Sequence, residues 1–188
     1  ALAWSIQGQV RLRTSSAYNQ ITVEDAGGYR LLRFNGSMET RMWLPNPLFG
    51  HFEYTEYFQM PLLFNPKPQR VLLMGLGGGS MVRAFQHHYP DIHLDTVELD
   101  PKVAQVAKQF FHVKETAKHK IHFSDGRQFL RLNKTRKYDA ILMDAYTSNQ
   151  FGTHIPFHLA TKEFFALASE DLTKEGVLVF NVIGTYDD

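Results

Sequence analysis

The chain has 188 residues, 44% of them hydrophobic, which suffices for one substantial core and a small appendage. Its 20 Lys and Arg residues balance 19 Asp and Glu residues, so we expect neither a nucleic-acid nor a membrane-surface partner. Cysteine is absent, which excludes disulfides and thiolate metal ligands, and no apolar run reaches the ~18 residues of a membrane span. Residues 1–4 are too short for an intact signal peptide, and we expect a cytoplasmic protein.

The first 50 residues predict a small N-terminal β-element, distinct from a catalytic domain over residues 51–188. Short β-prone runs there alternate with glycine-containing turns, a pattern typical of hairpins. The predicted strands are residues 21–23, 29–34 and 38–44, joined by turns at Gly27-Gly28 and Asn35-Gly36.

Residues 51–63 carry aromatic side chains at helical spacing and predict an amphipathic helix that Pro61 ends. From residue 70 onward, apolar strands alternate with helical patterns. The predicted strands are residues 71–74, 94–99, 121–123, 138–143 and 177–182, and the predicted helices are residues 81–89, 101–111, 126–130 and 161–172. Such alternation implies right-handed crossovers and a mostly parallel sheet with helices on both faces, a Rossmann-like α/β fold.

A glycine-rich turn with Gly75, Gly77 and Gly78 follows the first of these strands and leads into a helix. The absent side chains allow a ligand to approach the backbone closely. Glu98 ends the second strand, 19 residues after Gly79, near the ~20-residue offset at which an acidic residue binds a ribose diol. An exposed strand-end residue is the alternative interpretation of Glu98, and the offset favours ribose binding.

Two further carboxylates follow later strands. Asp125, with Gly126, opens a helix, so it either caps that helix or accepts a hydrogen bond from an exocyclic amino group such as that of adenine. Asp144 ends the fourth strand, where it can accept a proton from an amine nucleophile or simply order residues 147–153. We expect that segment to be a mobile lid.

The remaining candidates are weaker. The nine histidines show no ligand-like convergence, so we expect no metal site. The aromatic segment 49–64 is typical of a core or an interface, although Tyr54 and Glu56 precede the first strand and are candidates to overhang the cleft.

Several motifs together resemble the spermidine synthase (polyamine aminopropyltransferase) family. They are Val-Leu-Leu-Met-Gly-Leu-Gly-Gly-Gly-Ser (71–80), Val-Glu-Leu-Asp-Pro (97–101), Ser-Asp-Gly-Arg-Gln-Phe-Leu (124–130), Tyr-Asp-Ala-Ile-Leu-Met-Asp (138–144) and Tyr-Thr-Glu (54–56). Residues 16–21 also look like the opening strand of that family. The resemblance implies a class I methyltransferase fold, a homodimer and a bound S-adenosylmethionine or its decarboxylated form. It further implies that Asp144 is the base and that Tyr54, Glu56 and Tyr146 face a small-molecule or amine acceptor.

The chain departs from the family pattern at several polar positions, including Asn35 in place of an Asp. Gly78 stands where aminopropyltransferases carry an Asp that holds the donor's amino group, Thr147 replaces a second Asp, and Glu39 replaces a Gln. An Asp at position 78 would repel the carboxylate of S-adenosylmethionine, whereas free backbone N–H groups would attract it.

We therefore interpret the chain as a spermidine-synthase-like transferase that binds S-adenosylmethionine, a methyltransferase with an unknown acceptor. A divergent aminopropyltransferase that uses decarboxylated S-adenosylmethionine is the second hypothesis, and a non-catalytic nucleoside-binding domain is the third. Because this fold normally continues beyond its fifth strand, we expect the catalytic domain to be incomplete at its C-terminal end.

Overall fold

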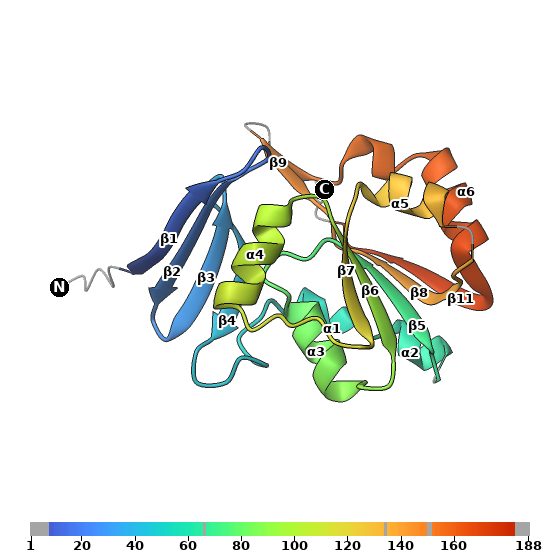
Figure 1. Cartoon of the computed structure of the whole chain (residues 1–188), viewed down its shortest axis with the longest axis horizontal. Coiled ribbons are helices and arrows are strands. Elements are labelled where there is room, and N and C mark those ends of the chain that lie inside the picture. Colours follow the sequence, from blue (N-terminus) through green and yellow to red (C-terminus); the bar gives the residue numbers. More distant parts are fainter. Residues whose placement is uncertain (1–7, 66, 134, 150–151, 183–188) are drawn as a thin grey trace, which may run out of the picture.

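The computed structural model describes residues 8–65, 67–133, 135–149 and 152–182. An antiparallel four-stranded sheet near the N-terminus lies beside a parallel five-stranded sheet that carries helices on its faces (Figure 1). This arrangement confirms the predicted α/β fold with an additional N-terminal β-element. Among the described helices, none is long and apolar enough to cross a membrane.

The N-terminal sheet has the strand order β1-β2-β3-β4. Its strands are β1 (Gln9–Ser15), β2 (Gln20–Ala26), β3 (Tyr29–Phe34) and β4 (Ser37–Trp43). Both predicted turns are present, and their central residues have positive φ, which glycine and asparagine tolerate best. The prediction of an opening strand at residues 16–21 was wrong in its position. Ser16 donates its backbone N–H to Asn19 in a turn, and the opening strand is the unpredicted β1.

The parallel sheet has the order β11-β8-β5-β6-β7. Its strands are β5 (Arg70–Met74), β6 (His93–Glu98), β7 (His119–Phe123), β8 (Tyr138–Met143) and β11 (Leu172–Phe180). The chain runs outward from β5 to β7 and then crosses back to place β8 on the other side of β5. The order therefore reverses between β5 and β8, the point at which open α/β sheets bind ligands.

Each face of this sheet is covered by its own helices. Val71 and Leu73 of β5 pack toward α3 (Ser80–His88) and α4 (Pro101–Phe110). Leu72 and Met74 point to the opposite face, which α5 (Gly126–Leu132) and α6 (Lys162–Asp171) cover. The alternation of fully buried apolar residues explains why β5 reads as an uninterrupted hydrophobic run.

Three local predictions need correction. Residues 51–63 form two short helices, α1 (Tyr54–Tyr57) and α2 (Pro61–Phe64), and Pro61 begins the second one, because the first helical turn tolerates a missing N–H. The segment expected to be a loop contains paired strands β9 (Thr147–Asn149) and β10 (Gly152–His154). Strand β11 starts at Leu172, five residues earlier than predicted, with an irregular register before Val177.

The N-terminal sheet and the parallel-sheet unit share a hydrophobic core. It joins residues of β2, β3 and β4 to α4 and the residue after it. Its buried members are Ile21, Val23, Leu32, Met42, Val103, Val106 and Phe111. This packing fixes β4 over the glycine-rich turn, so the N-terminal sheet contributes directly to the candidate site.

Candidate active site

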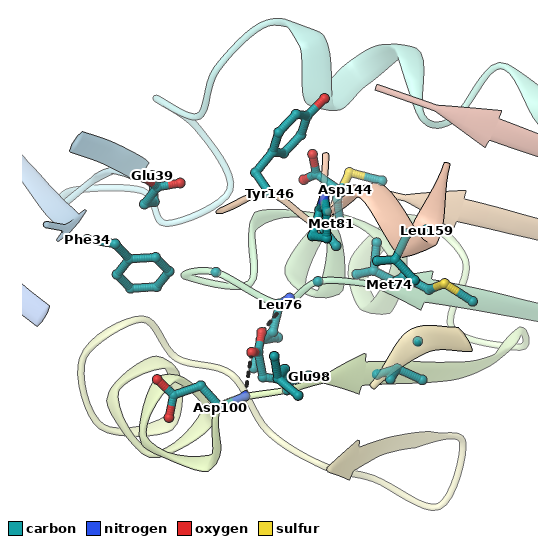
Figure 2. Close-up of a pocket in the computed structure, with 18 of the residues that line it drawn as sticks. Phe34, Glu39, Met74, Leu76, Met81, Glu98, Asp100, Asp144, Tyr146 and Leu159 are labelled. Carbon is teal, nitrogen blue, oxygen red and sulfur yellow. Dashed lines mark hydrogen bonds between the residues drawn. The ribbon is translucent and has the colours of Figure 1, made fainter. Parts of the chain in front are cut away.

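A pocket of about 370 Å³ lies at the carboxyl ends of β5, β6 and β8. Strand β4 and helix α1 close it on the side of the N-terminal sheet (Figure 2). Every predicted site residue lines this pocket except Glu56 and Gly78, and Gly78 belongs to the glycine-rich turn beside it. Predicted residues that line it are Tyr54, Gly75, Gly77, Glu98, Asp125, Gly126, Asp144 and Tyr146.

The glycine-rich turn is held by hydrogen bonds within the protein. Gly75 donates its N–H to Val97 O at 2.9 Å, Leu76 to Glu98 Oε2 at 3.0 Å, and Gly79 to Leu76 O at 2.8 Å. Arg83, buried beneath the turn, donates to the carbonyl oxygens of Gly78, Pro47 and Phe111. Burial lowers the pKa of Arg83 to about 10. These hydrogen bonds hold the turn in place, and its N–H groups at Gly75, Leu76 and Gly79 already have partners within the protein.

Gly78 is held directly against strand β4. Its N–H donates to Thr40 Oγ1 at 2.8 Å. A Cβ atom at position 78 would lie 2.6 Å from Thr40 Cγ2 and 2.8 Å from Thr40 Cβ, closer than real Cβ contacts. Glycine is thus required here by packing. The N–H group that was expected to attract a carboxylate is occupied by the Thr40 hydroxyl.

Gly75 is the second glycine that its surroundings require. Its φ is +95°, and a Cβ atom would lie 2.3 Å from the backbone oxygen of Asp144. The ends of β5 and β8 therefore touch at the point where the strand order reverses. Asp144 N also donates to Met74 O at 2.8 Å, which fixes the start of the segment after β8.

Glu98 lies at the end of β6 with its carboxylate turned back toward the turn. Its Oε2 accepts from Leu76 N and its Oε1 from Asp100 N at 2.9 Å, as Figure 2 shows. Burial raises the pKa of Glu98, and the two N–H donors oppose that rise. Each carboxylate oxygen keeps accepting capacity for a further donor, so the geometry is compatible with binding a diol.

Asp125 caps helix α5, as one of its two predicted roles requires. Its Oδ1 accepts from Gln128 N at 2.9 Å, and its Oδ2 lies 2.6 Å from Nε2 of His158. Gly126 begins the helix and approaches Met74 Sδ, so a side chain there would narrow the pocket. The adenine-binding role of Asp125 stays a prediction.

Asp144 stands at the opposite end of the pocket between two side chains. Its Oδ2 accepts from the Tyr54 hydroxyl at 3.3 Å, and its Oδ1 accepts from Asn181 Nδ2 at 3.1 Å. Burial raises the pKa of Asp144 to about 6, although both hydrogen bonds lower it. Tyr146 donates its hydroxyl to Asn181 O and so joins the same cluster.

Of the two acidic residues Glu56 and Glu39, the sequence favoured Glu56 as a site residue, but the structure places Glu39 at the pocket. Glu56 is exposed on α1, lies 3.3 Å from His51 Nε2 and does not line the pocket. Glu39 of β4 does line it (Figure 2). Burial raises the pKa of Glu39 to about 7, and the nearby charge of Asp144 contributes to that rise.

The pocket lining carries one sign of charge. Among the described lining residues there are five carboxylates and no Lys or Arg, and the one histidine, His158, is paired with Asp125. The five are Glu39, Glu98, Asp100, Asp125 and Asp144. Within the described part of the chain, no three His, Asp or Glu residues are grouped as metal ligands. The lining therefore favours a cationic ligand.

Residues 51–182 match the family model described as the spermine/spermidine synthase domain. The chain belongs to this family. A polyamine aminopropyltransferase from Vibrio vulnificus is 37% identical over 177 residues, which cover 90% of this chain and 58% of that protein. The chain thus spans less than two thirds of the length of this relative.

The solved structures that this chain resembles include a methyltransferase and a spermidine synthase. The crystal structure of human methyltransferase-like protein 13 in complex with SAH has a TM-score of 0.61 and 27% identity, covering 68% of this chain and 63% of that one. A spermidine synthase in complex with the transition-state analogue AdoDATO has a TM-score of 0.74 over 90% of this chain and 57% of that one. Its identity of 20% supports the shared fold alone.

Several residues at the site were not predicted as site residues, among them Glu39, His158 and Asn181. Glu39 was noted only as a departure from the family's Gln. His158 follows the segment 147–153, which was expected to be a loop, and Asn181 lies within the predicted strand of residues 177–182 without a motif that marks it. No periodicity or spacing marks these residues. Their positions depend on the path of β4, on the segment that brings His158 to Asp125, and on the end of β11, where Asn181 contacts Asp144.

Proposed function

We propose that the chain carries the catalytic site of an aminopropyltransferase that uses decarboxylated S-adenosylmethionine and a small amine acceptor. The observation that carries this proposal is the pocket lining, with five carboxylates and no Lys or Arg among its described residues. The donor bears a sulfonium and a primary ammonium group, and the acceptor is also cationic at neutral pH. A pocket of negative charge concentrates both.

The backbone of the glycine-rich turn supports the same choice of donor. S-adenosylmethionine retains a carboxylate, which needs N–H groups or a basic side chain as partners. At this turn the N–H groups of Leu76 and Gly78 already donate to Glu98 and Thr40. The decarboxylated donor makes no such demand. The proposal therefore replaces our sequence-based preference for methyl transfer.

Asp144 is the group best placed to act as the base. In aminopropyl transfer, the acceptor nitrogen attacks the carbon next to sulfur, the C–S bond breaks with its electron pair going to sulfur, and methylthioadenosine leaves. The nitrogen must lose a proton, which the Asp144 carboxylate accepts. With a pKa of about 6, this carboxylate is largely ionised at pH 7.5. Tyr54 and Asn181 orient its two oxygens through hydrogen bonds.

Methyl transfer remains the second candidate because of two specific observations. Position 78 lacks the Asp of aminopropyltransferases, and the human methyltransferase structure is similar over 68% of the chain. Both reactions are displacements at a carbon bound to a sulfonium, so positioning of the nucleophile is the main catalytic requirement of either.

Titration calorimetry with the two donors separates these functions. We expect decarboxylated S-adenosylmethionine to bind at least about tenfold more tightly than S-adenosylmethionine, since a clash of like charges in a partly buried site costs more than about 1.4 kcal/mol. With putrescine as a probe acceptor, spermidine and methylthioadenosine should form. Tighter binding of S-adenosylmethionine together with accumulation of S-adenosylhomocysteine would instead establish methyl transfer.

The same assay tests the base. Asp144→Asn should lower kcat about 10²- to 10⁴-fold, the range typical of a lost general base, while the donor still binds. Glu56→Gln, a carboxylate outside the pocket, serves as the matched control and should retain activity. An active Asp144→Asn enzyme would exclude Asp144 from proton transfer.

A further inference from the structure

Strand β4 contains a β-bulge at Glu39. On β3, Leu32 pairs with Thr40 and the next residue, Arg33, pairs with Met38, so Glu39 is an extra residue without a partner on β3. Such bulges bend a strand and redirect side chains, often beside active sites. Here the consequence is that two successive residues, Glu39 and Thr40, both line the pocket. In a regular strand they would point to opposite faces.

Thr40 and Glu39 both determine which acidic side chain enters the pocket near position 78. Thr40 packs against Gly78 so closely that a side chain at position 78 would force Thr40 to shift, and the family's Asp is therefore disfavoured there. Glu39 brings a carboxylate into the pocket from the neighbouring position. Within the described residues, this carboxylate has no hydrogen-bond or ion-pair partner, unlike those of Glu98, Asp125 and Asp144.

The other charged and titratable groups facing Glu39 do not neutralise it. Asp144, at the end of β8, is also acidic and contributes to the raised pKa of Glu39. Tyr54 on α1 is neutral, and its pKa is raised by burial first and also by Asp144 and Glu39. A cation between these elements would relieve the repulsion between the two carboxylates.

We propose that Glu39 is the counter-ion of the donor's primary ammonium group, replacing the loop Asp that Thr40 excludes at position 78. This inference rests on the proposed function and deepens it, because it assigns donor specificity to a bulge in the N-terminal sheet. Glu39 is thus a specificity-determining residue, whereas Asp144 acts on the acceptor.

Two ligands that share the nucleoside test the role. Methylthioadenosine carries the nucleoside but lacks the aminopropyl ammonium, and its sulfur is an uncharged thioether instead of a sulfonium. For Glu39→Gln, which keeps the shape and removes the charge, we expect the Kd of decarboxylated S-adenosylmethionine to rise about 10- to 100-fold, the loss of one charged hydrogen bond. The Kd of methylthioadenosine should change by less than about twofold, which also shows that the variant is folded. Glu39→Asp, which retains the charge, should recover part of the affinity.

Other outcomes would overturn the inference. Equal weakening of both ligands would mean that Glu39 only supports the pocket, and an unchanged donor Kd with a raised KM for putrescine would assign Glu39 to the acceptor. Glu56→Gln, with the same loss of charge outside the pocket, should change neither ligand. If the wild type transfers aminopropyl groups while Glu39→Gln binds the donor normally, the proposed function stands and this inference falls. If the wild type prefers S-adenosylmethionine, the proposed function falls, and the comparison of the two ligands still reports on Glu39.

Discussion

Two carboxylates in the pocket, Glu39 and Asp144, are harder to ionise than exposed ones. Glu39 and Asp144 lie close enough for the charge of one to raise the pKa of the other, and burial raises both, to about 7 and about 6. Side chains that are suboptimal for stability but aligned with the expected chemistry are typical of functional sites. A bound cation would offset the cost of ionising these carboxylates, so this cost favours binding of a cation.

This cost predicts how stability depends on pH. Because the folded pKa of Glu39 exceeds its unfolded value of 4.5, Glu39 stabilises the fold fully below about pH 4.5 and loses that contribution as the pH rises through about 7. Glu39→Gln should therefore be more stable than the wild type at pH 8, by roughly 1 kcal/mol after allowance for solvent screening, and nearly equal to it only below about pH 4.5, where Glu39 is protonated in both states.

Urea unfolding of both proteins at each pH measures this difference. His119 is buried and its pKa is lowered, so its protonation below about pH 6.5 destabilises both proteins alike and cancels in the comparison. A stability difference that does not vary with pH would contradict the raised pKa of Glu39.

At this scale the sequence predicted the residues that follow parallel strands. Glu98, Asp125 and Asp144 each end a strand or begin the next helix, and the topology of a parallel sheet brings such positions to one edge. Glu39 was missed as a site residue because a bulge, which has no simple sequence pattern, determines its direction. Glu56 was overrated because it lies two residues after Tyr54 in the same helix, α1, so the two side chains point to different faces.

At the scale of elements, the contact between β4 and the glycine-rich turn explains the most informative departure from the family. Gly78 was interpreted through charge, as a position that admits a carboxylate. The structure explains it through packing, because Thr40 occupies the space and takes the N–H. Sequence reasoning cannot separate these causes, since the strand that contacts the turn is 38 residues away.

The packing explanation predicts coupling between the two positions. Gly78→Asp alone should destabilise the protein by about 1–3 kcal/mol, the typical cost of overpacking. Thr40→Ala alone should also destabilise it, because the N–H of Gly78 loses its partner. The double variant removes the contacts with Cγ2 and Oγ1 of Thr40, although the contact with Cβ remains, so its cost should be less than the sum of the two, as a double-mutant cycle in urea would show. Additive costs would contradict direct packing of Thr40 on Gly78.

For the whole molecule, the pocket depends on how two sheets are joined. Glu39 and Thr40 belong to the N-terminal sheet, while Glu98, Asp125 and Asp144 belong to the parallel-sheet unit. The site is assembled only because the two units share a hydrophobic core. The strand pattern of the sequence predicted both units. It did not predict that α4 packs between them, because the apolar stripe of α4 is equally compatible with packing on the parallel sheet alone.

Phe111 tests whether this shared core makes the two units cooperative. It follows α4, is fully buried and packs in the cluster that contains Ile21 and Met42. Phe111→Ala should lower the free energy of unfolding by about 3–5 kcal/mol, as is usual for loss of a buried phenyl ring. In a Trp4→Phe background, tryptophan fluorescence reports only on Trp43 at the end of β4, and this signal and far-ultraviolet circular dichroism should follow one urea transition.

If the sheets were independent, the fluorescence transition would instead separate from the dichroism transition, and Phe111→Ala would shift the first with little effect on the second. The shared core instead predicts that both signals follow the same transition. Trp43 follows the buried Met42, which packs in one cluster with apolar residues of α4. Loosening of β4 therefore exposes those α4 residues at the same time. Donor affinity should fall together with stability in Phe111→Ala, since Glu39 can reach the ligand only while β4 is held on the turn.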